Sequence, residues 1–217
     1  MSIDIERDRT ALLLVDIQPD FMPGGALATA DGDDIVAPVQ RLLEAERFGL
    51  CAATQDWHPP RHVSFASEHA GREPLETIEL YGEEQVLWPD HCVQGTPGAE
   101  LHPEIDWNRV NVIVRKGMDP RVDSYSGFRD NVGPDGTRPP TGLAGYLRER
   151  GVDTVCVCGL ARDVCVQWTA EDAAAAGFRT VFIWDLTRPV TYDSDARTRA
   201  ALEQAGVEVV ELADLGG

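Results

Sequence analysis

Basic residues are scarce in this sequence and are nowhere clustered. Lysine and arginine number 19 against 37 aspartate and glutamate residues, so the formal net charge is −18, and the sequence pI is about 4.5. Binding of nucleic acid, or of an anionic membrane surface, depends on grouped cationic side chains. We therefore expect neither partner, and we attribute the excess of acidic residues to solubility.

Long apolar runs are also absent. No run approaches the ~18 residues of a membrane-spanning helix, and no basic N-terminal segment precedes an apolar core in the manner of a signal peptide. We expect a cytoplasmic protein. The sequence leaves the oligomeric state open, and a homo-oligomer is compatible with it.

Two families of sequence motif are missing. The chain has no P-loop and no GxGxxG segment, which argues against a nucleotide-binding or dinucleotide-binding function. It has five cysteines, an odd number, and no CxxC pair, so a disulfide framework is not expected.

Apolar runs alternate with helical patterns from one end of the chain to the other. Such alternation predicts a doubly wound α/β fold of the Rossmann-like kind, a six-stranded, mainly parallel sheet with helices on both faces. We expect one domain over residues 1–217, with a helix at 33–48 capped by Asp33 or Asp34. The other expected helices are 141–151, 163–177 and 194–205, and the expected strands are 10–17, 49–55, 110–117, 153–160, 179–186 and 207–212.

Three chemically useful side chains stand where predicted strands end. Asp16 closes the first strand, Lys116 closes the third, and Cys165 follows the fourth, in the first turn of a helix that Asp163 can cap. Ligands in open α/β sheets bind beyond the carboxyl ends of the strands. We expect the three strands to be neighbours, so that the helix dipole and Lys116 favour the thiolate of Cys165 and Asp16 exchanges its proton.

Each of these residues also has a structural interpretation. A buried cysteine is usually inert, an aspartate after a strand is often a turn residue, and a lysine there is often solvated. Cys156 and Cys158 lie in the middle of an apolar strand, two residues apart, and we assign both to the core. Only the combination of the three side chains favours catalysis.

A second group of polar residues lies in the irregular segment 56–109. Asp56 and His58 are two apart directly after a strand, so both side chains point the same way in extended chain, and His91 could complete the set. One carboxylate and two imidazoles suit a divalent transition metal with positions left for water or substrate. His62, His69 and His102 are alternatives to His91 as the third ligand. The other interpretation of these three residues is that they are ordinary surface histidines.

Five colinear motifs now allow a comparison with a known family. They are "LLLVDIQPDFMPGGAL", "TQDWHPPRHVSF", "WPDHCVQGTPGAELHP", "VRKGMDPRVDSYSGF" and "CGLARDVCV". Over nearly its whole length, the chain resembles the nicotinamidases (pyrazinamidases) of the isochorismatase-like cysteine hydrolase superfamily. The resemblance implies hydrolysis of nicotinamide, a small-molecule substrate, to nicotinic acid and ammonia through a thioester, in NAD salvage.

The resemblance also implies a role for individual residues. Cys165 would be the nucleophile, Asp16 the general base and then acid, and Lys116 the residue that holds and polarises the pair. The backbone N–H groups of Ala161 and Cys165 would form the oxyanion hole, with a cis peptide bond between Leu160 and Ala161. Asp56, His58 and His91 match the family's metal ligands, with zinc expected first and iron or manganese as alternatives. Residues that match the family's apolar substrate pocket are Phe21, Leu27, Trp88, Tyr125 and Ala161.

The chain departs from the family pattern beside the nucleophile. The family commonly has threonine and tyrosine in its "GLATDYCV"-like loop where this chain has Arg162 and Val164, so we expect a different pocket rim. Some members also recruit a nearby histidine as a fourth metal ligand, and His62 is the candidate.

Other functions remain as alternatives. Isochorismatases lack the cysteine, whereas amidohydrolases that act on carbamoyl amines or other small amides keep the Asp–Lys–Cys set and generally lack the metal residues. A catalytically silent binding protein would leave Cys165 no more reactive than a buried thiol. A structural metal protein would close its coordination shell. The filled catalytic and metal positions favour the nicotinamidase interpretation.

Overall fold

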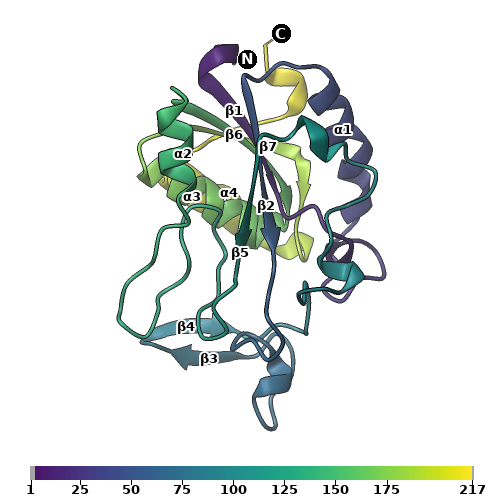
Figure 1. Ribbon diagram of the computed structural model, residues 1–217, viewed down its shortest axis with the longest axis vertical. Coiled ribbons are helices and arrows are strands. Elements are labelled where there is room, and N and C mark those ends of the chain that lie inside the picture. Colours follow the sequence, from purple (N-terminus) through teal and green to yellow (C-terminus); the bar gives the residue numbers. More distant parts are fainter. Residues whose placement is uncertain (1–2, 217) are drawn as a thin grey trace.

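The computed structural model describes residues 3–216, and its centre is a six-stranded sheet in the order β5-β2-β1-β6-β7-β8 (Figure 1). All five strand pairs are parallel. The prediction of a doubly wound, mainly parallel sheet is therefore confirmed. The strand bounds are β1 Thr10–Val15, β2 Leu50–Asp56, β5 Val112–Lys116, β6 Thr154–Leu160, β7 Arg179–Arg188 and β8 Glu208–Val210.

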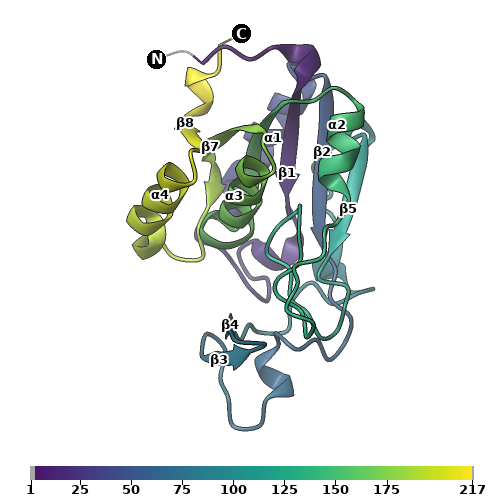
Figure 2. The same cartoon turned by 90° about the vertical axis from the view of Figure 1, so that its left-hand side faces the viewer.

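Helices cover both faces of this sheet. Helix α1 (Val36–Glu44) packs on one face, and α2 (Leu143–Glu149), α3 (Gln167–Ala175) and α4 (Asp195–Gln204) pack on the other (Figures 1 and 2). The position of β1 between the two layers explains why its residues Ala11 to Val15 are all apolar. Successive side chains point to opposite faces, so Leu12 and Leu14 join the α1 side while Leu13 joins the other. Both faces are buried, and a continuous apolar run results.

The two mid-strand cysteines belong to this core. Cys156 and Cys158 are fully buried on the α1 side of β6, as their spacing predicts. Burial raises the pKa of Cys156 to about 12 and that of Cys158 further still. Neither thiol is ionised near neutral pH.

The start of the first helix differs from the prediction. Residues Gly32–Ile35 form a 3₁₀ turn, and α1 begins only at Val36, with no side-chain cap from Asp33 or Asp34. Pro38 explains the shift, because proline lacks an N–H and fits a helix only in its first turn. A helix from residue 33 would place Pro38 in its interior.

The irregular segment contains a hairpin that the sequence pattern did not reveal. Strands β3 (Thr77–Leu80) and β4 (Glu83–Val86) pair antiparallel around Tyr81 and Gly82, both with positive φ. Five of the eight strand residues are threonine, glutamate or glutamine, and the three apolar ones are only partly buried, so the alternation of apolar residues is weak. The hairpin lies beyond the carboxyl ends of the central strands (Figures 1 and 2).

No helix within residues 3–216 combines the length and the apolar character needed to cross a membrane.

Candidate active site

The predicted polar residues lie at or just after the carboxyl ends of four strands, on one edge of the sheet. Asp16 follows β1, Asp56 ends β2, Lys116 ends β5, and Cys165 follows β6. Strands β1 and β6 are neighbours, as expected, but β2 separates β5 from β1. Lys116 therefore reaches its partners past Asp56 from the edge of the sheet.

The ammonium group of Lys116 joins these residues. Its Nζ lies 2.9 Å from Asp16 Oδ2, 2.9 Å from Asp56 Oδ1 and 3.4 Å from Cys165 Sγ, and it donates to the carbonyl oxygen of Ser124 at 2.8 Å. The side chain is fully buried. Burial alone would lower the pKa of Lys116, but Asp16 and Asp56 outweigh it and raise that pKa well above its ordinary value. The lysine is a permanent buried cation.

Asp16 is held by the neighbouring strand. Its backbone φ is +47°, which aspartate tolerates better than most residues, and its Oδ1 accepts a hydrogen bond of 2.6 Å from Thr54 Oγ1. The side chain has no solvent exposure. Burial raises the pKa of Asp16, with Lys116 opposing it. The carboxylate is thus a stronger base than an exposed aspartate.

Cys165 lies in a π-helical turn, Arg162–Val166, that leads into α3. Its side chain is buried, and burial raises the pKa of the thiol well above its ordinary value even though Lys116 lowers it. Lys116 favours the thiolate, as predicted, but desolvation outweighs its effect. The thiol therefore needs a base, and the side chain of Asp16 interacts with it directly.

The predicted cap of this turn is also wrong. Asp163 Oδ1 accepts a hydrogen bond of 2.9 Å from the backbone N–H of Val190, which follows β7, and caps no helix. The peptide bond between Leu160 and Ala161 is cis, as the resemblance implies. Ala161 and Cys165 both line the pocket described below.

Asp56, His58 and His91 form a candidate site for a divalent metal ion. Their ligand atoms lie within 4.8 Å of one another, and all three residues are buried. Burial opposes ionisation of Asp56, but His58 and Lys116 together hold its pKa well below its ordinary value. The carboxylate is charged, as a metal ligand requires.

The two imidazoles are oriented for such an ion. His58 Nδ1 lies 3.0 Å from the carbonyl of Gly117, and His91 Nδ1 lies 2.8 Å from the carbonyl of Pro89. A carbonyl can only accept, so each Nδ1 carries a proton, and each Nε2 is the ring nitrogen that can bind a metal ion once it is deprotonated. These Nε2 atoms lie 3.0 and 3.3 Å from the same oxygen, Oδ2 of Asp56. The donor set converges, and it fits a transition metal.

Gly117 is required for this orientation. Its φ is +66°, and a Cβ there would lie 2.4 Å from Cε1 of His58. Only glycine avoids both penalties.

The remaining histidines lie outside this group. His62 is fully buried, so the surface interpretation is wrong for it. It pairs with Ser64 Oγ at 2.7 Å and joins a different candidate group with His58 and Asp123. His69 and His102 are partly exposed and take part in neither group.

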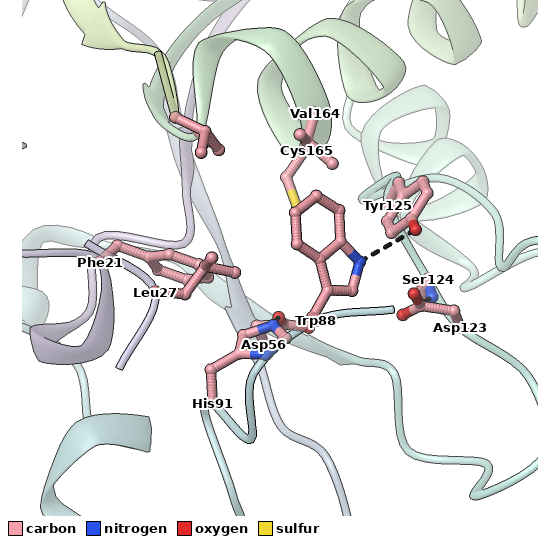
Figure 3. A pocket seen from close by; sticks show the side chains of 12 residues that line it. Phe21, Leu27, Asp56, Trp88, His91, Asp123, Ser124, Tyr125, Val164 and Cys165 are labelled. Atoms are coloured by element: carbon pink, nitrogen blue, oxygen red, sulfur yellow. Dashed lines mark hydrogen bonds and ion pairs between the residues drawn. The ribbon is translucent and has the colours of Figure 1, made fainter. Parts of the chain in front are cut away.

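Cys165, Asp56 and His91 line one pocket, whose free space of about 330 Å³ includes solvent at its mouth. Figure 3 shows Phe21 and Leu27 facing Trp88 and Tyr125, with Cys165 at one end and Asp56 and His91 at the other. Trp88 Nε1 donates to the hydroxyl of Tyr125 at 3.0 Å, which fixes both rings. All five residues predicted for the pocket, Phe21, Leu27, Trp88, Tyr125 and Ala161, line it.

Several residues near this pocket were not predicted from the sequence. Asp123, Ser124 and Val190 line it. Gln18 is fully buried behind it, and its side-chain amide donates to the carbonyl of Asp56 and accepts from the N–H of Asp56, at 2.8 and 2.7 Å. Gln18 and Asp123 stand inside two of the quoted motifs, so position within a motif was the available signal.

Of the two residues that depart from the family pattern, one lines the pocket and the other packs away from it. Val164 lines the pocket, as expected for its rim. Arg162 does not: its buried guanidinium stacks on Trp184 at 4.0 Å and bonds Thr187 and Asp195. It anchors the turn to β7 and α4, and the expectation that it shapes the rim is wrong.

Comparison with known proteins agrees with this geometry. The isochorismatase domain family model matches residues 10–214. A nicotinamidase from Acinetobacter baylyi is 46% identical over 185 residues, 85% of this chain and 84% of the relative. A nicotinamidase from Escherichia coli is 43% identical over 208 residues, 94% and 95% of the two chains.

Solved structures of nicotinamidases and pyrazinamidases have the same fold as this chain. A nicotinamidase/pyrazinamidase from Acinetobacter baumanii superposes with a TM-score of 0.90 at 44% identity, covering 97% of this chain and 99% of that one. PnC1 from L. infantum in complex with nicotinate has a TM-score of 0.86 at 35% identity, covering 100% and 99%. A pyrazinamidase from Pyrococcus horikoshii in complex with zinc has a TM-score of 0.72 at 34% identity, covering 94% and 99%.

Proposed function

This chain belongs to the isochorismatase family, and we propose that it is a nicotinamidase that hydrolyses nicotinamide to nicotinic acid and ammonia. One observation carries the proposal: a fully buried lysine lies 2.9 Å from the carboxylate of Asp16 and 3.4 Å from the thiol of Cys165, at the end of an aromatic pocket. A carboxylate, a fixed cation and a thiol are the parts needed for nucleophilic attack on an amide.

The first step is activation of the thiol. Cys165 is neutral at rest, and Asp16 is a base strengthened by burial, so Asp16 takes the thiol proton as the sulfur attacks the carboxamide carbon. Lys116 remains charged throughout and stabilises the thiolate that forms beside it. Because the proton moves during the attack, no thiolate is needed in the free enzyme.

The second step breaks the amide bond. We assign the backbone N–H groups of Ala161 and Cys165 to the developing oxyanion, since fixed donors aimed at developing charge are often the largest catalytic contribution. Asp16 returns the proton to the amide nitrogen, the C–N bond breaks, and ammonia leaves a thioester on Cys165. Water, deprotonated by Asp16, then attacks the thioester, and nicotinic acid and the free thiol are released.

The pocket selects a flat ring. Phe21 and Leu27 face Trp88 and Tyr125 across it, so a pyridine ring would be held between apolar and aromatic surfaces (Figure 3). With the carboxamide directed toward Cys165, the ring nitrogen would point toward Asp56 and His91. The match in shape supports a pyridine carboxamide over an aliphatic carbamoyl amine.

We propose that Asp56, His58 and His91 hold zinc. A carboxylate and two imidazole Nε2 atoms suit this ion and leave coordination positions open. When bound, the metal supplies a Lewis acid, with its waters, that can hold the ring nitrogen. Gln18 and Gly117 would keep two of the ligands in place.

The test is ammonia release from nicotinamide by the purified protein, measured beside Cys165→Ala and a chelator-treated sample. We expect release by the untreated protein, none from the variant, and reactivation of the treated sample by Zn²⁺. Circular dichroism confirms that the variant is folded. Substantial turnover by folded Cys165→Ala would reject the nucleophile, and full activity without metal would reject the metal's role.

A further inference from the structure

A second hollow adjoins the catalytic pocket. It is an open groove of about 1350 Å³, and its walls come from β4, α3, α4 and the segment after β7. It shares four residues with the pocket: Trp88, Tyr125, Val164 and Val190. The two spaces therefore meet along one wall.

Val164 stands at this junction. It lines both spaces, as Trp88 and Tyr125 do, is partly exposed, and lies in the turn that carries Cys165 (Figure 3). Its isopropyl group is short, whereas the tyrosine common at this position in the family would extend several ångströms further. The wall between the pocket and the groove is accordingly low at this point.

The groove has a definite chemistry. Leu75, Val86 and Trp168 give it an apolar side, and Leu75 is 61% exposed. Three carboxylates line it, those of Glu84, Asp163 and Asp193, against one guanidinium, that of Arg197. Its charge, three negative and one positive, is that of an acceptor for a cation. The chain as a whole, at −18, adds to this potential.

We propose that the groove is a second part of the substrate site, and that the enzyme also hydrolyses pyridine carboxamides whose ring carries a flexible substituent ending in a protonated amine. This inference rests on the proposed amidase function. The carboxamide would lie against Cys165, the ring in the aromatic pocket, and the substituent would pass over Val164. The alkyl part contacts Trp168 and Leu75, and the ammonium group meets Glu84 and Asp193. The reaction is the same hydrolysis, with ammonia as the leaving group.

The test is a set of nicotinamides with an aminoalkyl chain at each free ring carbon, each paired with its neutral N-acetyl counterpart. The measurement is kcat/KM relative to that of nicotinamide. We expect at least one ring position with a value within about tenfold of nicotinamide, and a preference for the cation over its neutral counterpart of roughly threefold or more that weakens with added salt.

Two variants locate the effect. Val164→Tyr should lower the ratio of extended substrate to nicotinamide by about tenfold or more, because the ring of tyrosine closes the junction. Glu84→Gln with Asp193→Asn should bring the cation preference close to one. The matched control removes two exposed carboxylates elsewhere, Glu149→Gln with Glu203→Gln, and should keep the preference.

The outcomes separate the two proposals. Turnover of nicotinamide without turnover of any extended compound would overturn the groove assignment alone. A cation preference that survives Glu84→Gln with Asp193→Asn would also overturn it. No turnover of nicotinamide itself would overturn the proposed function, and this inference with it.

Discussion

Replacing Lys116 with methionine tests the buried charge cluster directly. Methionine keeps the length of the side chain and removes its charge, so Asp16 and Asp56 lose the cation that lies 2.9 Å from each. At an effective dielectric constant of about 20, each of these contacts is worth roughly 6 kcal/mol of gross attraction. Desolvation already offsets much of that, and removal of one partner of a buried ion pair typically costs about 3–5 kcal/mol.

We therefore expect Lys116→Met to lose about 3–5 kcal/mol in the free energy of unfolding, together with its activity. The assay is urea unfolding of metal-free protein, followed by tryptophan fluorescence. With a slope of about 3 kcal/mol per molar urea, the midpoint falls by roughly 1–1.7 M. The double variant Lys116→Met with Asp16→Asn removes one of the stranded carboxylates, and it should recover at least half of the loss.

The deficit should also depend on pH. Without Lys116, the pKa of folded Asp16 rises further above its unfolded value, so the folded state binds the extra proton. The loss of stability caused by ionised Asp16 is complete above its pKa in the folded state. It disappears as the pH falls toward the pKa of Asp16 in the unfolded state. The difference between wild type and Lys116→Met is thus smaller at pH 5 than at pH 8. A loss under about 1 kcal/mol, or a double variant no more stable than the single one, would refute the reasoning.

Three further predictions concern single groups. Because burial raises the pKa of Asp16 above 3.8 and the base must be ionised, kcat/KM should fall with decreasing pH at a value above 3.8, while bound metal, measured in parallel, is retained; a limb at 3.8 would contradict this. Gly117→Ala should weaken metal binding about 10–100-fold by displacing His58. Gly136 has a similar φ of +74° and open space around it, so Gly136→Ala should lower only stability. Equal metal affinity of the two variants would reject the steric argument. Cys156, with a pKa of about 12, should resist alkylation at pH 8 until the protein unfolds, as mass spectrometry of labelled peptides can establish; rapid labelling of native protein would place the thiol at the surface.

The apolar strands were predictable because both of their faces are buried. Strand β1 has apolar residues at every position from Ala11 to Val15, and the run they form is visible without a structure. The hairpin β3–β4 was not predictable, because its residues are mostly exposed and no burial imposes a pattern. The strand order was also not predictable, since Lys116 reaches Asp16 from an edge strand that no local pattern identifies.

Which residues meet at the candidate site was also predictable in part. Asp16, Lys116 and Cys165 follow strands, so topology alone brings them to one edge of the sheet. The effect of burial on the pKa of Cys165 was not predictable, because desolvation depends on everything that packs around the thiol and not on neighbours in sequence. Arg162 likewise stands beside Cys165 in sequence and turns away from the pocket, toward Asp195, 33 residues later.

The position of β5 at the margin of the sheet has a consequence for heat resistance. This strand is paired on one side only, with β2, and its Ile113 is 40% exposed. Local opening of such a margin needs less free energy than unfolding of the central strands. Fraying there would withdraw Lys116 from Asp16 and Cys165 while β1 and β6 stay paired. On warming, this enzyme should lose turnover before it loses its secondary structure.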